Sequence, residues 1–172
     1  MARLPYADPD LPALQSQAAR IRAERGGKML NLYKMLLHSP PVADGWRQLL
    51  TAIRQQGTLA ARYRELAILR VAVLNEAPYE FAQHVPFARS EGVTETQLEA
   101  MQQIDCGSAF DADDALVLAY TDAMTRQIRV PPALFAAVKA RFDAREIVEL
   151  TATIGAYNMV SRFLEALELD HD

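Results

Sequence analysis

Cysteine is almost absent from this chain of 172 residues, which contains only Cys106. A single cysteine excludes an internal disulfide, a Cys-x-x-Cys redox pair and a zinc site made of several thiolates. The sequence also lacks a Gly-rich phosphate loop and a Gly-x-Ser-x-Gly elbow. We therefore expect neither a metal nor a cofactor.

An excess of basic charge and a long apolar run are lacking as well. The chain has 22 acidic and 18 basic residues, for a formal net charge of -4, which gives no basic footprint for nucleic acid. No apolar run approaches the roughly 20 residues needed to span a bilayer, and the N-terminus has no apolar signal segment. We expect a reduced, cytoplasmic protein that binds neither nucleic acid nor membranes.

Glycine is scarce, with seven residues, whereas 51% of the chain is hydrophobic and 23% is charged. These proportions exclude a disordered chain and a collagen-like chain. Ala, Leu, Arg and Glu dominate and favour helices. At this length one proper core can be buried, so the composition predicts a single helical domain.

Apolar residues recur at helical spacing, and no alternating stretch indicates a strand. Between Leu66 and Leu74 every residue except Arg70 is apolar, which predicts a helix buried on nearly all sides. The next helix should begin at Pro78 and stop at Gly92. Residues 38–41 are expected to break the chain between a helix over residues 29–37 and another that runs through Trp46 to Gly57. Other helices are expected over residues 11–25, 94–103 (with a capping box at its start), 111–129, 131–142 and 145–169, the last as one helix or two.

We expect an N-terminal arm and helix over residues 1–28, the first nine residues being loose, and a helical domain over residues 29–170. Arg64-Glu65-Leu66 opens one apolar helix of that domain, and Arg145-Glu146-Ile147 opens another. A duplicated helical hairpin is one interpretation of this echo, and chance is the other. With either interpretation we predict an all-α, single-domain helical bundle.

Glu80 and His84 stand four residues apart, which places them on one helical face, about 5–6 Å apart at Cβ. An apolar stripe of Phe81, Val85 and Ala88 lies about 100° round the helix. We therefore expect the pair at the edge of the core, where partial burial holds the imidazole near neutrality as a general acid or base. An exposed polar pair is the simpler alternative, which the spacing alone favours.

Arg70 interrupts the apolar helix, and a buried guanidinium needs a carboxylate from the protein or from a ligand. Glu65 is roughly 140° away on the same helix and cannot easily be that partner. We favour an ion pair with another helix, with Glu80 or Glu146 as candidates, over substrate binding. The same two alternatives apply to Glu65.

The segment from Tyr63 to His84, followed by Gly92-Val-Thr, resembles the carboxymuconolactone decarboxylase family, which is related to the alkyl hydroperoxidase D proteins. The motif consists of Arg-Glu, a buried helix, Glu-x-x-x-His and a glycine that ends the helix. The similarity extends from about Met29 to Leu169. It implies an alkyl hydroperoxidase D-like bundle that assembles as a homo-oligomer (dimer, trimer or hexamer), with sites near subunit boundaries.

The peroxidase branch of these proteins has two cysteines before the histidine, at the positions of Ala77 and Glu80 here. Because both thiols are absent, the resemblance points to the decarboxylase side. It implies a cofactor-independent lyase for a small organic acid or lactone, with His84 as the proton donor and Glu80 as its orienter. Glu65 matches a glutamate of the peroxidase proton relay and is expected to be a second relay group.

Arg70 and Tyr79 are the residues that we expect to bind the substrate. Two other functions stay open: an antioxidant protein that relies on Cys106 or on a partner's thiol, and a non-catalytic protein that binds a small ligand. Cys106 has no His or basic residue beside it in the sequence, so we expect its own role to be structural or incidental.

Overall fold

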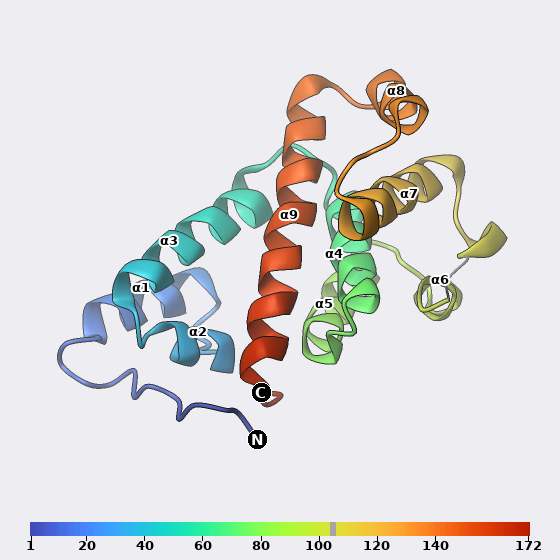
Figure 1. Cartoon of the computed structure of the whole chain (residues 1–172). Helices are drawn as coiled ribbons and strands as arrows, with labels where there is room; N and C mark the ends of the chain where they lie inside the picture. Colours follow the sequence, from blue (N-terminus) through green and yellow to red (C-terminus); the bar gives the residue numbers. More distant parts are fainter. Residues whose placement is uncertain (104–105) are drawn as a thin grey trace. The chain divides into compact units, whose positions relative to one another are not determined.

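The computed structural model describes residues 1–103 and 106–172. Its elements are α1 (Gln15–Glu24), α2 (Asn31–Leu36), α3 (Pro40–Thr51), the π-helical turn η1 (Ala52–Gln56), α4 (Ala61–Leu74), α5 (Pro78–Ser90), α6 (Glu95–Met101), the 3-10 turn η2 (Gly107–Ala109), α7 (Ala112–Gln127), α8 (Pro132–Arg141) and α9 (Ala144–Leu167) (Figure 1). No strand occurs in these described ranges, so the prediction of an all-α fold is confirmed.

The chain forms two compact units. One contains residues 1–56 together with 164–172, and the other contains residues 57–163. The boundary expected after residue 28 falls inside the first unit, and the division into 1–28 and 29–170 stays a prediction.

The first nine residues, expected to be a loose arm, form no helix but are tied to the C-terminal segment. The main-chain N–H of Arg3 donates to the carbonyl of Leu167 at 2.9 Å. The hydroxyl of Tyr6 lies 3.2 Å from a carboxylate oxygen of Asp170. The expectation of a loose arm is therefore wrong, because these long-range hydrogen bonds leave no periodic trace in the sequence.

In the second unit α4 is the central helix, and it packs mainly against α5 and α7 (Figure 1). Its residues 65–72 are all buried, as the apolar run predicts. A tight turn follows, in which the N–H of Ala77 donates to the carbonyl of Ala72 at 2.8 Å. Pro78 then occupies the first position of α5, where its missing N–H costs nothing. The turn sends α5 back along α4, and this hairpin positions the candidate site.

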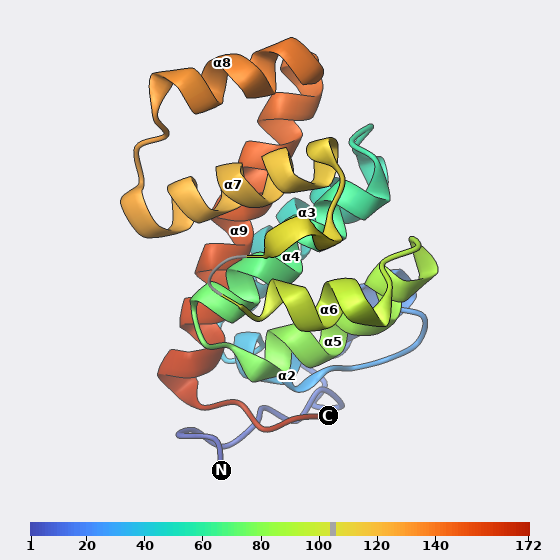
Figure 2. The same cartoon turned by 90° about the vertical axis from the view of Figure 1, so that its right-hand side faces the viewer.

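The other helix ends of this unit follow the expected signals. Thr94 forms the predicted capping box with Gln97 at the start of α6. Gly92 has a φ of +82°, a left-handed conformation that favours glycine just after a helix. After α7 a short connection over residues 128–131 leads to α8 (Figure 2).

α9 is a single helix, so Gly155 does not divide it. The second Arg-Glu pair of the sequence echo, at residues 145 and 146, does open this helix. However, α9 has 24 residues and runs on without turning back, whereas α4 has 14 and leads into a hairpin. The expectation of a second hairpin after residue 145 is therefore wrong.

Candidate acid–base site

The α4–α5 hairpin brings Glu65 and His84 into direct contact. The ring atom Nδ1 of His84 lies 2.7 Å from Oε2 of Glu65. The two side chains are only 8% and 1% exposed. A carboxylate at Nδ1 fixes the orientation of an imidazole and increases its basicity. Nε2, at the opposite edge of the ring, is then the nitrogen from which a proton can pass to a ligand.

α5 faces the core with a different side from the one expected. Glu80 and His84 are 2% and 6% exposed, so the pair is neither a surface pair nor at the edge of the core. Of the apolar stripe, Ala88 is buried, whereas Phe81 and Val85 remain partly exposed. Polar side chains can be buried in this way where hydrogen bonds compensate for lost water.

The carboxylate of Glu80 is hydrogen-bonded to a residue of α9. The hydroxyl of Ser161 lies 3.2 and 3.1 Å from Oε1 and Oε2 of Glu80, and Ser161 is fully buried. The contact at Nδ1 of His84 therefore gives Glu65 the orienting position that the resemblance assigned to Glu80. The chemical roles of Glu80, Glu65 and His84 stay predictions.

Two aromatic rings enclose the imidazole. Tyr157 meets His84 edge to face, with ring centroids 5.0 Å apart and an interplanar angle of 89°. Phe87 lies on α5 itself, 5.8 Å away and tilted by 50°. Tyr157 is buried, but Phe87 is 47% exposed. The buried ring therefore has one aromatic neighbour in the core and one at the surface.

Arg70 forms the ion pair between helices that was expected, but with a different partner. Its Nε and Nη2 donate to the two carboxylate oxygens of Asp122 on α7, at 2.6 and 2.7 Å. Its Nη1 donates to two main-chain carbonyls at the end of α6. Asp122 raises the pKa of the guanidinium by hydrogen bonding, although burial opposes this. The candidates Glu80 and Glu146 are wrong, because α7 lies against this part of α4.

These contacts favour the structural interpretation of Arg70 over substrate binding, because all three of its guanidinium nitrogens are engaged. Tyr79, the other expected substrate-binding residue, is buried in the first turn of α5 and its role stays a prediction. Cys106 is partly exposed and lies just before η2, and its role stays a prediction.

Arg64 also contacts this site, although in the sequence it stands out only as part of the Arg-Glu motif. Its Nε lies 3.1 Å from Oε1 of Glu65, so Arg64, Glu65 and His84 form one chain of contacts. One signal in the sequence could have identified it. A cation near the N-terminal end of a helix is disfavoured by the helix dipole, so an arginine kept there indicates a specific partner.

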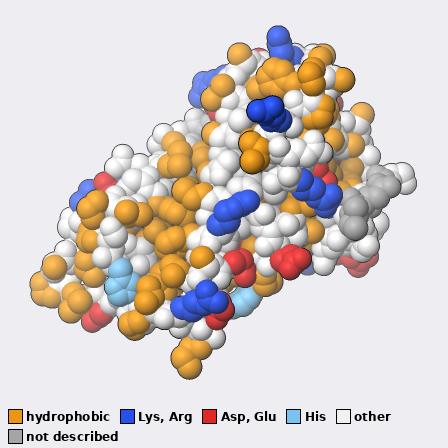
Figure 3. All heavy atoms as spheres, viewed as in Figure 1, with side chains coloured by type: hydrophobic (Ala, Val, Ile, Leu, Met, Phe, Trp, Pro, Cys, Tyr) orange, Lys and Arg blue, Asp and Glu red, His pale blue; other side chains and the backbone are white. Residues whose placement is uncertain are grey.

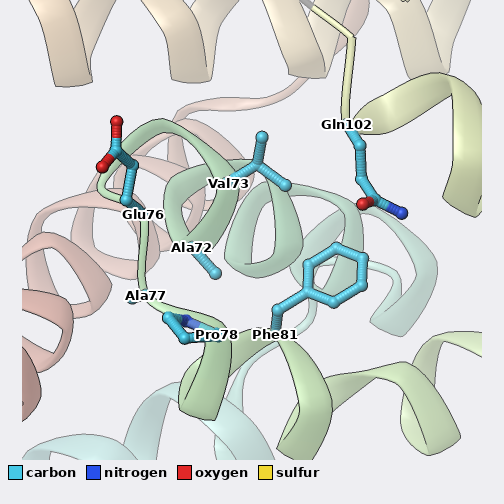
Figure 4. Close-up of a pocket in the computed structure, with 7 residues that line it drawn as sticks. All are labelled: Ala72, Val73, Glu76, Ala77, Pro78, Phe81 and Gln102. Atoms are coloured by element: carbon cyan, nitrogen blue, oxygen red, sulfur yellow. The ribbon is translucent and has the colours of Figure 1, made fainter.

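An open pocket of about 390 Å³ lies beside the turn between α4 and α5, within the size range of small-ligand sites. Figure 4 shows the Phe81 ring facing Gln102 across it, with Val73 close by. The lining residues are Ala72, Val73, Glu76, Ala77, Pro78, Phe81 and Gln102. Phe81 lines this pocket from α5 and lies about 60° round the helix from His84. The acid–base residues themselves do not line this pocket.

The side chains on the face shown in Figure 3 form no continuous basic surface among the described residues, since Lys and Arg lie interspersed with other types. Within residues 1–103 and 106–172, no cluster of three His, Cys, Asp or Glu side chains could hold a metal ion. No helix in the same ranges has both the length and the apolar character for a membrane span.

One sequence comparison and several structural comparisons show what this chain is similar to. Residues 40–122, which include the whole α4–α5 hairpin, match the carboxymuconolactone decarboxylase family. A peroxidase-related protein from Silicibacter sp. TM1040 has the same fold, with a TM-score of 0.84 and 20% identity over 99% of this chain and 92% of that one. Over residues 40–122 this chain is similar to the carboxymuconolactone decarboxylase family, and its fold is that of the peroxidase-related proteins.

Other solved structures match nearly the whole chain. The alkylhydroperoxidase AhpD core protein from Ralstonia eutropha JMP134 has a TM-score of 0.85 and 16% identity, over 99% of this chain and 92% of that one. The debrominase Bmp8 in complex with 2,3,4-tribromopyrrole has a TM-score of 0.78 and 14% identity, over 99% and 90%. At these identities the likeness shows a shared fold. No curated protein sequence matches the chain.

Proposed function

We propose that this protein is a cofactor-independent lyase that decarboxylates a small organic acid or lactone, with His84 as the proton donor. The observation that carries the proposal is the 2.7 Å contact between Nδ1 of His84 and Oε2 of Glu65, both almost fully buried. A buried ring held by a carboxylate can gain and lose a proton at its other nitrogen without moving.

The reaction requires few groups. The carbon–carbon bond to the substrate carboxylate breaks, carbon dioxide leaves, and the electron pair is delocalised over the unsaturated lactone or ketone as an enolate. His84 then delivers a proton to carbon from Nε2. Glu65 stabilises the charged ring before transfer, since a buried imidazolium without a carboxylate partner would be strongly disfavoured. Glu80, one turn earlier on α5, adds a second carboxylate on the same helical face.

Turnover of variants tests the role of His84. A panel of carboxylated unsaturated lactones and 3-oxo acids is incubated with the protein, and release of carbon dioxide is measured. We expect His84→Gln to lower turnover about 10²–10⁴-fold, which is the usual contribution of a well-placed acid. His38→Gln is the matched control, because His38 is exposed and lies on α2's C-terminal side, outside the site. Unchanged turnover in His84→Gln would remove His84 from the mechanism.

An antioxidant function through Cys106 is the second candidate. The thiol is partly exposed, and a thiolate there would be one of the charges that raise the pKa of Arg70. A nearby cation favours the thiolate, which is the reactive form. Consumption of a hydroperoxide by the wild-type protein, lost in Cys106→Ser, together with no release of carbon dioxide from any panel member, would replace the lyase proposal with this one.

A further inference from the structure

Three arginines on α4 differ in how they use their guanidinium groups. Arg62 binds Asp114 through two nitrogens, Nε at 3.1 Å and Nη2 at 2.6 Å, and its Nη1 donates to a main-chain carbonyl. Arg70 binds Asp122 in the same two-pronged way. Such paired contacts are the usual geometry of an arginine whose role is to form an ion pair with a carboxylate.

Arg64 is the exception. It contacts Glu65 through Nε alone, at 3.1 Å. Within the described parts of the chain, Nη1 and Nη2 of Arg64 make no hydrogen bond or ion pair. The side chain is nevertheless 17% exposed, so it is sheltered but reachable from solvent. The two terminal nitrogens therefore form an open donor fork next to the carboxylate that holds His84.

The position of Arg64 also favours a bound anion. Arg64 and Glu65 are neighbours in the chain and point about 100° apart on the helix, so they do not naturally face each other. The N-terminal end of α4 adds a partial positive charge, which disfavours Arg64 and favours a negative group beside it. A guanidinium fork matches the two oxygens of a carboxylate.

We propose that Arg64 binds a carboxylate of the ligand through Nη1 and Nη2, and so selects anionic ligands for the site at His84. Arg64 is a specificity residue in this account, and the link to turnover rests on the proposed lyase function. The carboxylate that it holds is one that stays on the product. If Arg64 bound the carboxylate that leaves as carbon dioxide, it would stabilise the ground state more than the transition state and slow the reaction.

Binding of benzoate tests this inference without any assumption about the true substrate. Benzoate is a flat carboxylate, and benzamide is its neutral analogue of nearly the same shape. The protein is labelled with ¹⁵N-histidine, and the ring signals are followed during titration. The chain has three histidines, of which His38 and His171 are exposed and serve as internal references.

We expect benzoate to shift the His84 signals with saturation, and benzamide to bind about ten- to a hundredfold more weakly. Arg64→Gln should remove this preference for benzoate, and Arg64→Lys should restore only part of it, because lysine keeps the charge but not the fork. Arg89→Gln is the matched control. Arg89 loses the same charge in an exposed ion pair with Glu95, and the preference should remain.

Two results would overturn the inference: no saturable shift of the His84 signals with benzoate, or an equal preference for benzoate in wild-type and Arg64→Gln. The backbone spectrum of each variant reports whether it is folded. The outcome is separable from that of the lyase proposal. If benzoate binding depends on Arg64 but His84→Gln leaves turnover intact, the anion site stands and the proposed mechanism fails. If benzoate binding does not depend on Arg64 but His84→Gln lowers turnover, the proposed mechanism stands and the anion site fails.

Discussion

Replacing Asp122 by alanine should destabilise the protein more than any exposed ion-pair change of similar geometry. The substitution removes both carboxylate oxygens that bind Arg70, at 2.6 and 2.7 Å. The Arg70 side chain is only 1% exposed, so its charge would lose its carboxylate partner in the interior. The two main-chain carbonyls at the end of α6 would remain as hydrogen-bond acceptors.

The expected loss in the free energy of unfolding is about 3 kcal/mol. Breaking a buried ion pair by removing one partner typically costs about 3–5 kcal/mol. The lower end applies because the side chain of Asp122 is 25% exposed, so water can enter the space and partly solvate the guanidinium. Arg70→Met together with Asp122→Ala should recover part of the loss, since an apolar side chain removes the unpaired charge.

Urea unfolding followed by circular dichroism measures the effect. Glu95→Ala is the control, because Glu95 binds Arg89 at 2.6 and 2.9 Å, in nearly the same geometry, but both side chains are more than half exposed. The midpoint should hardly change in this control. If the two single variants unfold at the same urea concentration, burial is not what makes the Arg70–Asp122 pair important.

Two further stability predictions concern the capping box of α6 and the pH dependence that Glu149 contributes. Thr94→Ala removes the capping box of α6 and should lower the free energy of unfolding by about 1 kcal/mol, measured by urea unfolding. The effect should be absent in Thr96→Ala, which lies in the same first turn but takes no part in the capping box. Burial opposes ionisation of Glu149, but hydrogen bonds from the N–H groups of Leu59 and Thr58 and from Arg145 lower its pKa overall. Its stabilising contribution is therefore present at neutral pH and lost as the pH falls through that lowered pKa. Glu149→Gln should unfold more easily than wild type at pH 7, and the difference should shrink in acid; a difference independent of pH would contradict the assignment.

The sequence predicts the helices of the second unit well because their signals are local. The apolar run from Leu66 to Leu74 requires burial on all sides, and the structure buries residues 65–72. Pro78 and Thr94 mark helix starts through the chemistry of one or two neighbouring residues. Signals of this kind need no knowledge of what packs against the helix.

The partners of buried polar groups cannot be predicted from such local sequence signals. Arg70 needed a carboxylate, but the choice of Asp122, 52 residues away, depends on how α7 packs on α4. The burial of Glu80 likewise depends on Ser161, a residue of α9 with no distinctive sequence pattern around it. The prediction for α5 compared the faces of the helix by their apolar content alone. It therefore expected the wrong face of α5 to lie against the core.

The acid–base pair combines both kinds of information. Glu65 and His84 are each placed by a predictable helix, but their contact depends on the turn at residues 75–77 that joins the helices. Each residue added to that turn would rotate α5 by about 100° relative to α4 if the helices kept their packing. His84 would then face away from Glu65, and Gln83 would take its place. The turn is strained at Glu76, whose φ of +53° is uncommon for a residue other than glycine. The register of the hairpin, set by this short turn, therefore decides whether Glu65 of α4 and His84 of α5 form one site.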